Sequence, residues 1–171
     1  MYNTFELIEL LKKESYEIEV HQHDALFTVE DSKKLRGKIN GAHSKNLFLK
    51  NKKNEFFLLS CEEADKIDLK KISKSLELGN ISFAKQEYLE RYLKIKPGSV
   101  SPFALLNDVD GFVNFYLEQN LYESKFVNFH PLINTFTITI KTNKFIEFMI
   151  ENNKKIHIFS SKDEIILKTY E

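Results

Sequence analysis

Residues that support covalent cross-links, sharp chain reversals or membrane spans are scarce in this sequence. It has one cysteine, no tryptophan, three prolines and five glycines among 171 residues. The single cysteine, Cys61, cannot form an internal disulfide, so we expect a reducing, cytoplasmic environment. No uninterrupted apolar run exceeds four residues, as at positions 56–59, whereas a membrane-spanning helix needs about 20. We therefore expect no membrane partner.

Net charge of either sign is also missing. The 25 basic residues balance the 25 acidic ones, so the molecule as a whole does not attract polyphosphate and DNA is not expected as a partner. Any contact with nucleic acid must come from a local patch. The sequence also lacks a glycine-rich phosphate loop, paired cysteines and a serine elbow, so the usual nucleotide, zinc-finger and hydrolase signatures fail and no cofactor is expected.

What is present predicts a globular chain. Apolar residues make up 42% of the sequence, with 15 phenylalanines and 7 tyrosines, which disfavours disorder. A chain of this length fits one ordinary domain, and we expect residues 1–171 to form it.

Local patterns indicate alternating helices and strands. Asn3 and Glu6 have the spacing of a capping box before a helix at about residues 4–14. Alternation at 16–20 and 135–140 predicts strands, and the runs 47–49 and 56–61 flank a polar turn that suits a hairpin. Asp68 is expected to cap a second helix, and Thr142 or Asn143 a third that buries positions 145–150. Two short strands should close the chain around 160–163. The fold class is therefore α+β, with a mixed, mostly antiparallel sheet and flanking helices.

Several polar residues are candidates for chemistry, each beside a structural alternative. On one strand His21 and His23 would point the same way and could share a metal with Asp24 or His43, or they could simply be polar residues at a strand end. Lys45 opens an apolar strand, where a lysine is usually solvated. His130, between Phe129 and Pro131, could equally complete local hydrogen bonds.

Four segments together resemble the YbaK/ProX family of aminoacyl-tRNA deacylases, most closely its prolyl-tRNA editing branch. They are LFTVE at 26–30, SKNLFLK at 44–50, PGSVSPFALLND at 97–108 and VNFHPLINT at 127–135. The order and separation of these segments carry the resemblance, which spans nearly the whole chain. The family fold is a mixed sheet curled towards a barrel and ringed by helices, in agreement with the local patterns.

The resemblance implies roles for individual residues. Lys45 corresponds to the family's functional lysine, and the residues expected to bind the substrate are Asn46, His130 and the loop of Gly98, Ser99, Val100, Ser101 and Pro102. Phe27 and Val29 are expected to line a small apolar pocket, unless they are ordinary core residues. Lys50, Lys52 and Lys53 are expected to contact the acceptor stem, unless they form a merely solvated surface.

The function implied is that of a freestanding trans-editing hydrolase, which removes alanine from mischarged tRNA for proline without a metal or cofactor. Prolyl-tRNA synthetase is a candidate docking partner. Three alternatives stay open: a deacylase for cysteine or another small amino acid, a noncatalytic tRNA-binding or regulatory module of the same fold, and a metal hydrolase that uses His21 and His23.

Overall fold

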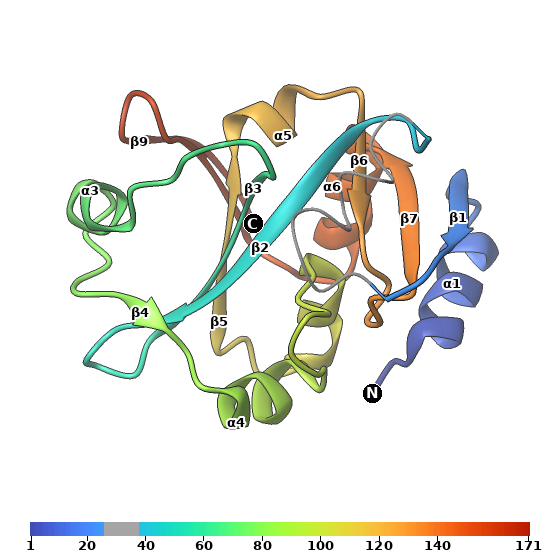
Figure 1. Ribbon diagram of the computed structural model, residues 1–171, viewed down its shortest axis with the longest axis horizontal. Helices are drawn as coiled ribbons and strands as arrows, with labels where there is room; N and C mark the ends of the chain where they lie inside the picture. The colour runs from blue at the N-terminus through green and yellow to red at the C-terminus, as the bar shows by residue number, and fades with distance from the viewer. Residues whose placement is uncertain (26–37) are drawn as a thin grey trace.

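The fold is a large twisted sheet with helices on both faces. We describe it from a computed structural model, which defines residues 1–25 and 38–171 (Figure 1). The strands are β1 (Ile18–Gln22), β2 (Ala42–Lys50), β3 (Phe56–Glu62), β4 (Ser82–Phe83), β5 (Val113–Glu118), β6 (Phe126–Phe129), β7 (Phe136–Lys141), β8 (Ile156–Ser160) and β9 (Ile165–Tyr170). The helices are α1 (Thr4–Lys13), α3 (Leu69–Ser75), α4 (Gln86–Tyr88), α5 (Gln119–Glu123) and α6 (Thr142–Glu151), with a π-helical turn η1 (Leu89–Leu93) and a 3₁₀ helix η2 (Pro102–Asn107).

The sheet is mixed and open. Among the described residues its order is β1-β7-β6-β2-β3-β5-β8-β9, and β4 pairs with β2 away from this path. The pairs β2–β6, β3–β5 and β5–β8 are parallel, and the other five are antiparallel. β1 and β9 are its two edges, so the sheet curls without closing into a barrel. The predicted class, an α+β fold with a mostly antiparallel sheet, is confirmed.

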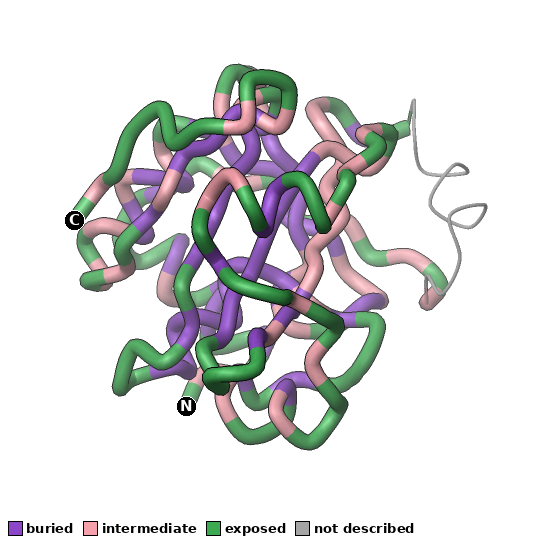
Figure 2. The backbone as a smooth tube through the Cα atoms, turned by 90° about the vertical axis from the view of Figure 1, so that its left-hand side faces the viewer, coloured by how far each residue is buried: buried purple, intermediate pink, exposed green. Residues whose placement is uncertain are grey.

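Two apolar clusters pack on opposite faces of the sheet. The main core lies between one face and α1, α6 and η2. There Phe103 meets Phe145 and Phe148 edge-on, at ring-centroid distances of 5.6 and 6.0 Å. Complete burial of such a side chain stabilises the fold by about 1.5–3 kcal/mol. A smaller cluster on the other face packs beneath α3. The central strands are therefore buried along most of their length (Figure 2).

Two of the three helix caps predicted from the sequence are confirmed. Asn3 accepts hydrogen bonds from the backbone N–H groups of Phe5 and Glu6 at 2.9 and 3.0 Å, and the Glu6 carboxylate completes the predicted capping box. Asp68 caps α3 as expected. The predicted cap of α6 is wrong, because Thr142 is the first helical residue and Lys141 occupies the cap position. The Thr142 hydroxyl instead donates to the carbonyl of Ser124.

The first strand begins later than predicted. Tyr16 packs against the main core instead of starting the strand, and its hydroxyl donates to the Glu151 carboxylate at 2.5 Å. The backbone of Ser15 has a positive φ of 63°, so the chain turns sharply between α1 and β1. The alternation at 16–20 therefore combines a turn residue with the strand that begins at Ile18.

Candidate active site

The central feature of the site is a short stretch of β2 with a free edge. On one side β2 pairs with β3 from Ser44 to Lys50. On the other side it pairs with β6 only through Ala42 and His43, and with β4 only through its last two residues. Residues 44–47 thus have no strand partner on that side within the described part of the chain, and we call them the β2 window. Figure 1 shows β2 and β6 separating from their shared end.

The window brings Lys45 and His130 to the same level. β6 runs parallel to β2 with Ala42 opposite Val127 and His43 opposite Asn128, so Lys45 and His130 each stand two residues beyond the last pair. Both side chains are half-buried. Two candidates separated by 85 positions in the sequence, Lys45 and His130, therefore lie at the same level, where the two strands diverge.

Lys45 is held from the side of α3. Its ammonium group donates to the backbone carbonyl of Asp65, in the loop between β3 and α3. The carboxylate of Asp65 in turn accepts from the side-chain amide of Asn120, at 3.1 and 3.2 Å. Cys61 stands opposite Lys45 on β3 and is fully buried. Burial raises the pKa of the Cys61 thiol to about 12, so at neutral pH it is not a nucleophile.

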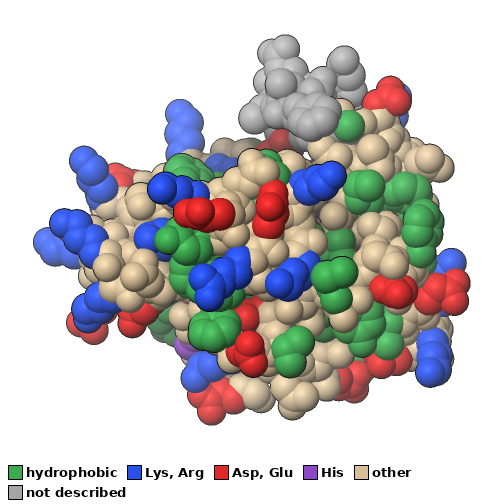
Figure 3. Space-filling model, turned by 90° about the horizontal axis from the view of Figure 1, so that it is seen from below, with side chains coloured by type: hydrophobic (Ala, Val, Ile, Leu, Met, Phe, Trp, Pro, Cys, Tyr) green, Lys and Arg blue, Asp and Glu red, His purple; other side chains and the backbone are tan. Residues whose placement is uncertain are grey.

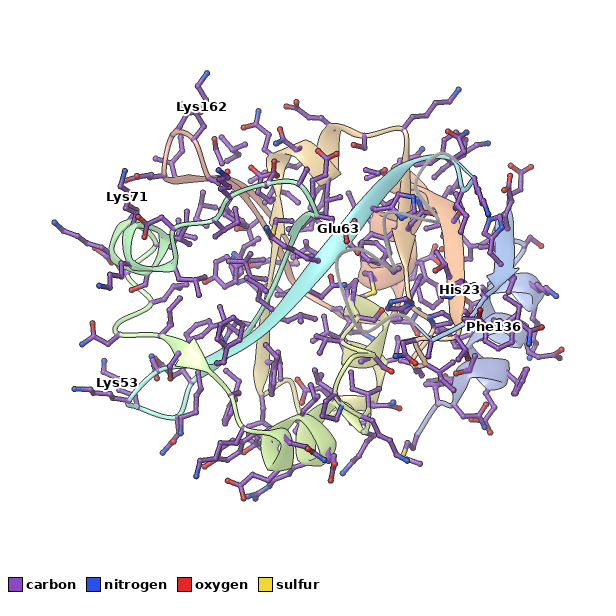
Figure 4. The ribbon with its side chains drawn as sticks, in the orientation of Figure 1. His23, Lys53, Glu63, Lys71, Phe136 and Lys162 are labelled. Carbon is purple, nitrogen blue, oxygen red and sulfur yellow. The ribbon has the colours of Figure 1, made fainter. Side chains whose placement is uncertain are left out.

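His130 faces two other histidines. Its Nδ1 lies 2.8 Å from the carbonyl of Phe136, which can only accept, so Nδ1 carries the hydrogen and Nε2 is the acceptor nitrogen of the neutral ring. Burial, aided by the charges of His23 and His43, lowers the pKa of His130. The rings of His23 and His130 are 6.1 Å apart. Figure 4 shows His23 beside Phe136. Because its pKa is lowered, the imidazole ring of His130 is neutral at physiological pH.

His21 and His23 are each bound to a threonine of β7. Nε2 of His21 lies 3.2 Å from the hydroxyl of Thr139, and Nε2 of His23 lies 2.8 Å from the hydroxyl of Thr137. Across residues 1–25 and 38–171, no three histidine, cysteine, aspartate or glutamate side chains are grouped so that they could hold a metal ion. The geometry around these two histidines is that of polar residues on a half-buried strand.

Asn46 points to the opposite face from Lys45, as strand alternation requires. Its Oδ1 accepts from the hydroxyl of Ser60 at 2.6 Å, and its amide donates to Ser44 at 3.2 Å. The hydroxyl of Ser44 continues to the carbonyl of Asn128 at 2.9 Å. This chain of hydrogen bonds links β3, β2 and β6 and fixes the orientation of the Asn46 amide.

The loop from Gly98 to Pro102 leads into η2 on the core face of the sheet. Gly98 has a φ of 84°, and the hydroxyl of Ser101 caps η2 by accepting from the N–H of Phe103. The ring of Phe103 packs edge-on against Phe129, the residue before His130, at 6.0 Å. η2 and the loop that leads into it are therefore anchored to the end of β6.

Within the described residues, three N–H groups of this loop have no hydrogen-bond partner. Ser99 donates to the carbonyl of Lys96, whereas the N–H groups of the exposed Gly98 and of Val100 and Ser101 make no hydrogen bond with any other described residue. Ser101 is fully buried and Val100 is half-buried against the main core. Buried N–H groups nearly always have a partner, so donors without one can bind a ligand oxygen.

Comparison with known proteins identifies the family of this chain. A family model described as an aminoacyl-tRNA editing domain matches residues 23–148. The chain belongs to this family.

Relatives of this editing family include the prolyl-tRNA editing protein ProX of Acetoanaerobium sticklandii, which is 33% identical over 70% of this chain and 73% of its own length. Another is the prolyl-tRNA synthetase associated domain-containing protein 1 of Bos taurus, 36% identical over 77% of this chain and 79% of its own length. The resemblance to the prolyl-tRNA editing branch of the YbaK/ProX family is thereby confirmed, as is the class of enzyme, an aminoacyl-tRNA deacylase.

Solved structures of the same fold include a candidate trans-editing enzyme for prolyl tRNA synthetase. That structure superposes with a TM-score of 0.67 over 91% of this chain and 96% of its own, at 15% identity. The likeness supports the fold of this editing-family member.

The remaining predicted residues are not gathered at the window. Lys52 and Lys53 are exposed at the tip of the β2–β3 hairpin. The ammonium group of Lys50 donates to the side chain of Asn54 at 2.9 Å and lies 4.8 Å from the centre of the Tyr88 ring, so it is occupied within the protein. The predicted pocket residues Phe27 and Val29 lie outside the described residues.

Sequence reasoning missed three supporting residues. Ser44 and Ser60 orient Asn46, and Asp65 holds Lys45 through a backbone carbonyl, which no side-chain pattern reveals. His43 was considered only as a metal ligand, although its position two residues before Lys45 places both on one face of a strand.

None of the helices within the described residues has the length and apolar character that a membrane crossing requires.

Proposed function

We propose that this chain is a trans-editing hydrolase that deacylates mischarged tRNA for proline, with alanine as the preferred aminoacyl group. The observation that carries the proposal is the β2 window, which contains Lys45 and lies beside the end of β6, where His130 follows and to which η2 and the loop before it are anchored. The names of the relatives ProX and prolyl-tRNA synthetase associated domain-containing protein 1 support tRNA for proline as the substrate.

The chemistry needs orientation and charge stabilisation more than a strong nucleophile, because an ester on a ribose hydroxyl is already activated. Water adds to the ester carbonyl, the bond to the ribose oxygen breaks, and that oxygen takes up the proton which the water loses. The products are the free amino acid and a tRNA with an intact 3′ end. A buried, protonated Cys61 and the absence of a metal-binding group in the described residues are both compatible with this route.

Each group at the site has a task in this reaction. Lys45 binds the phosphate or ribose of the terminal adenosine as a cationic donor. The N–H groups of Val100 and Ser101 bind the carbonyl oxygen as negative charge develops on it, a role worth about 3 kcal/mol per donor. Nε2 of the neutral His130 accepts a hydrogen bond from the attacking water or from the α-ammonium group of the amino acid.

Selectivity for alanine follows from size. A synthetase pocket built for proline cannot strongly exclude a smaller side chain, because each missing methylene is worth only about 1–3 kcal/mol. A second site that admits a methyl group and rejects a five-membered ring corrects this error. We propose that Phe27, Val29 and the region of His130 contribute the walls of that pocket. Prolyl-tRNA synthetase is then the enzyme that produces the mischarged tRNA. Co-sedimentation can test whether this protein and the synthetase form a direct complex.

The test is a hydrolysis panel with alanyl-, cysteinyl- and prolyl-tRNA for proline. We expect rapid release of alanine, slower release of cysteine and no loss of correctly charged prolyl-tRNA. Cysteine released faster than alanine would identify a cysteine deacylase instead. Tight binding of all three without release would identify a noncatalytic module, and loss of activity on addition of a chelator would identify a metal hydrolase.

A further inference from the structure

An aromatic ring stands exposed beside the strand that carries the site. Phe83 of β4 is 65% exposed, although Leu49, its partner on β2, is fully buried. Directly opposed residues on paired strands point to the same face of a sheet. Leu49 and Cys61 belong to the apolar cluster on that face. Lys45 lies directly opposite Cys61, so it is on the same face. Phe83 and Lys45 are therefore on the same face, about 13 Å apart along β2 at about 3.3 Å per residue.

Next to Phe83 lies a hollow with basic walls. It has a volume of about 760 Å³ and lies between α3 and the segment that leads into β4. Lys70 and Lys74 line it from α3 together with Glu77, and Ile81, two residues before Phe83, closes it on the β4 side. An exposed ring and a basic hollow are thus continuous along one edge of the sheet.

The lysines around this hollow are not neutralised. Lys52, Lys53, Lys70 and Lys74 are all exposed, and none forms an ion pair with another described residue. The side chain of Asn51 donates to the carbonyl of Leu78 at 2.9 Å, which fastens the β2–β3 hairpin to the segment beside the hollow. Figure 4 shows Lys53 and Lys71 pointing away from the body at the same end, and Figure 3 shows basic side chains gathered there.

We infer that Phe83 and the basic hollow bind the single-stranded 3′ end of the tRNA acceptor, with Phe83 stacking on one of its bases. Nonspecific binding of single strands combines a positively charged groove with aromatic rings on which bases stack. The separation of about 13 Å between Lys45 and Phe83 matches three or four stacked nucleotides at about 3.4 Å each. This inference rests on the proposed function, since it requires the terminal adenosine to be at Lys45.

The first test measures the affinity of uncharged tRNA for proline by fluorescence anisotropy, which does not depend on catalysis. Phe83→Ala should weaken binding about 5-fold to about 150-fold, the range that base stacking covers. Phe5→Ala is the matched control, because Phe5 is 67% exposed on α1, at the opposite end of the molecule (Figure 1). Equal affinities for the Phe83→Ala and Phe5→Ala variants would overturn the inference.

The basic hollow is tested with paired charge reversals. Lys70→Glu with Lys74→Glu should weaken tRNA binding and flatten its dependence on salt, because phosphate contacts release counterions. Lys12→Glu with Lys13→Glu is the control, since both lysines are exposed in the last turn of α1. If both double variants weaken binding equally, only overall charge matters and the hollow is not the site.

The assignment to the 3′ single strand is tested with a tRNA that lacks its last four nucleotides. The wild-type protein should bind this RNA more weakly, and Phe83→Ala should then have no further effect, because the ring and its base form one interaction. A Phe83 effect that persists on the shortened RNA would overturn the assignment. If the hydrolysis panel shows no deacylation at all, the proposed function fails while these binding measurements still decide the inference.

Discussion

Removing the ammonium group of Lys45 should stop editing without unfolding the protein. Lys45→Met keeps an unbranched side chain of nearly the same length and removes the ammonium group with its charge and hydrogen bonds. In the folded protein the change costs the hydrogen bond from the Lys45 ammonium group to the Asp65 carbonyl, and a bond that involves a charged group is worth about 1.5–3 kcal/mol when nothing replaces it. Because Lys45 is half-buried and Asp65 lies in a loop, water can replace that donor, so we expect a small loss of stability.

The effect on catalysis should be much larger. A hydrogen bond to a charged group contributes about 1.5–3 kcal/mol, and each 1.36 kcal/mol is a factor of ten. Losing one such bond to the terminal adenosine lowers kcat/KM about 10-fold to about 150-fold, and losing two abolishes measurable turnover. Lys45→Arg keeps the charge but replaces a compact ammonium group with a larger planar fork, so it should restore only part of the activity.

The assay is single-turnover hydrolysis of alanyl-tRNA for proline, with circular dichroism as a check of folding. Lys144→Met is the matched control, because Lys144 pairs with Glu147 at 2.7 Å on α6, which packs on the other face of the sheet. The control should keep wild-type activity. Turnover of Lys45→Met within twofold of wild type, in a folded protein, would refute the assignment of Lys45.

Three further predictions concern the surroundings of the site and the fold. Gly41→Ala should lower the free energy of unfolding in urea more than Gly111→Ala does, although both glycines have a positive φ. At Gly41 the added Cβ would lie 2.8 Å from the carbonyl oxygen of Phe126, whereas at Gly111 it would have no neighbour within 4 Å. The lowered pKa of His130 predicts that its neutral form persists below pH 6.5, so deacylation should decline only at lower pH. His130→Gln should abolish this decline. His157→Gln is the control, because it removes another histidine of lowered pKa and should leave the pH dependence unchanged. Asn3→Ala should cost about 1 kcal/mol of stability through loss of the capping box, while Asn143→Ala should cost almost nothing.

The stability effect of His130 has a definite sign. Its pKa in the folded protein is depressed, so the unfolded chain binds more protons once the pH falls below the ordinary value of 6.5. Folding stability from this group is therefore complete above that pH and is lost as the pH falls towards the folded pKa. The loss is at most about 1.36 kcal/mol per pH unit, measurable as a shift of the urea midpoint. A midpoint that rises on acidification in wild type but not in His130→Gln would contradict this account.

Elements governed by local physics were predictable from the sequence. The capping box at Asn3, the cap at Asp68, the β2–β3 hairpin and the alternation of β7 each depend on residues that are close together in the sequence. Each is a short-range pattern that tertiary packing did not override. The predicted cap of α6 is wrong because Thr142 already lies inside the helix, where its hydroxyl donates to the carbonyl of the distant Ser124.

The site itself was predictable only through resemblance. Composition left Lys45 as a solvated lysine and His130 as a histidine in an apolar stretch. What joins them is the parallel pairing of β2 with β6, between residues more than 80 positions apart, and no local pattern specifies that pairing. β6 is only four residues long and is separated from α5 by two residues, so it carries too little periodicity to be recognised as a strand.

The adjacency of Lys45 and Asn46 then acquires a physical meaning. Neighbours in a strand point to opposite faces, so a substrate that touches both side chains must pass an edge of that strand. β3 covers one edge of β2, and β6 and β4 cover the two ends of the other, which leaves residues 44–47 as the place within the described residues where such a passage is open. Within the described residues, the backbone groups on this side of 44–47 have no strand partner, and such groups can bind a polar ligand. An aminoacylated adenosine seated there would place its ribose and phosphate on the Lys45 face and its ester towards Asn46 and the 98–102 loop.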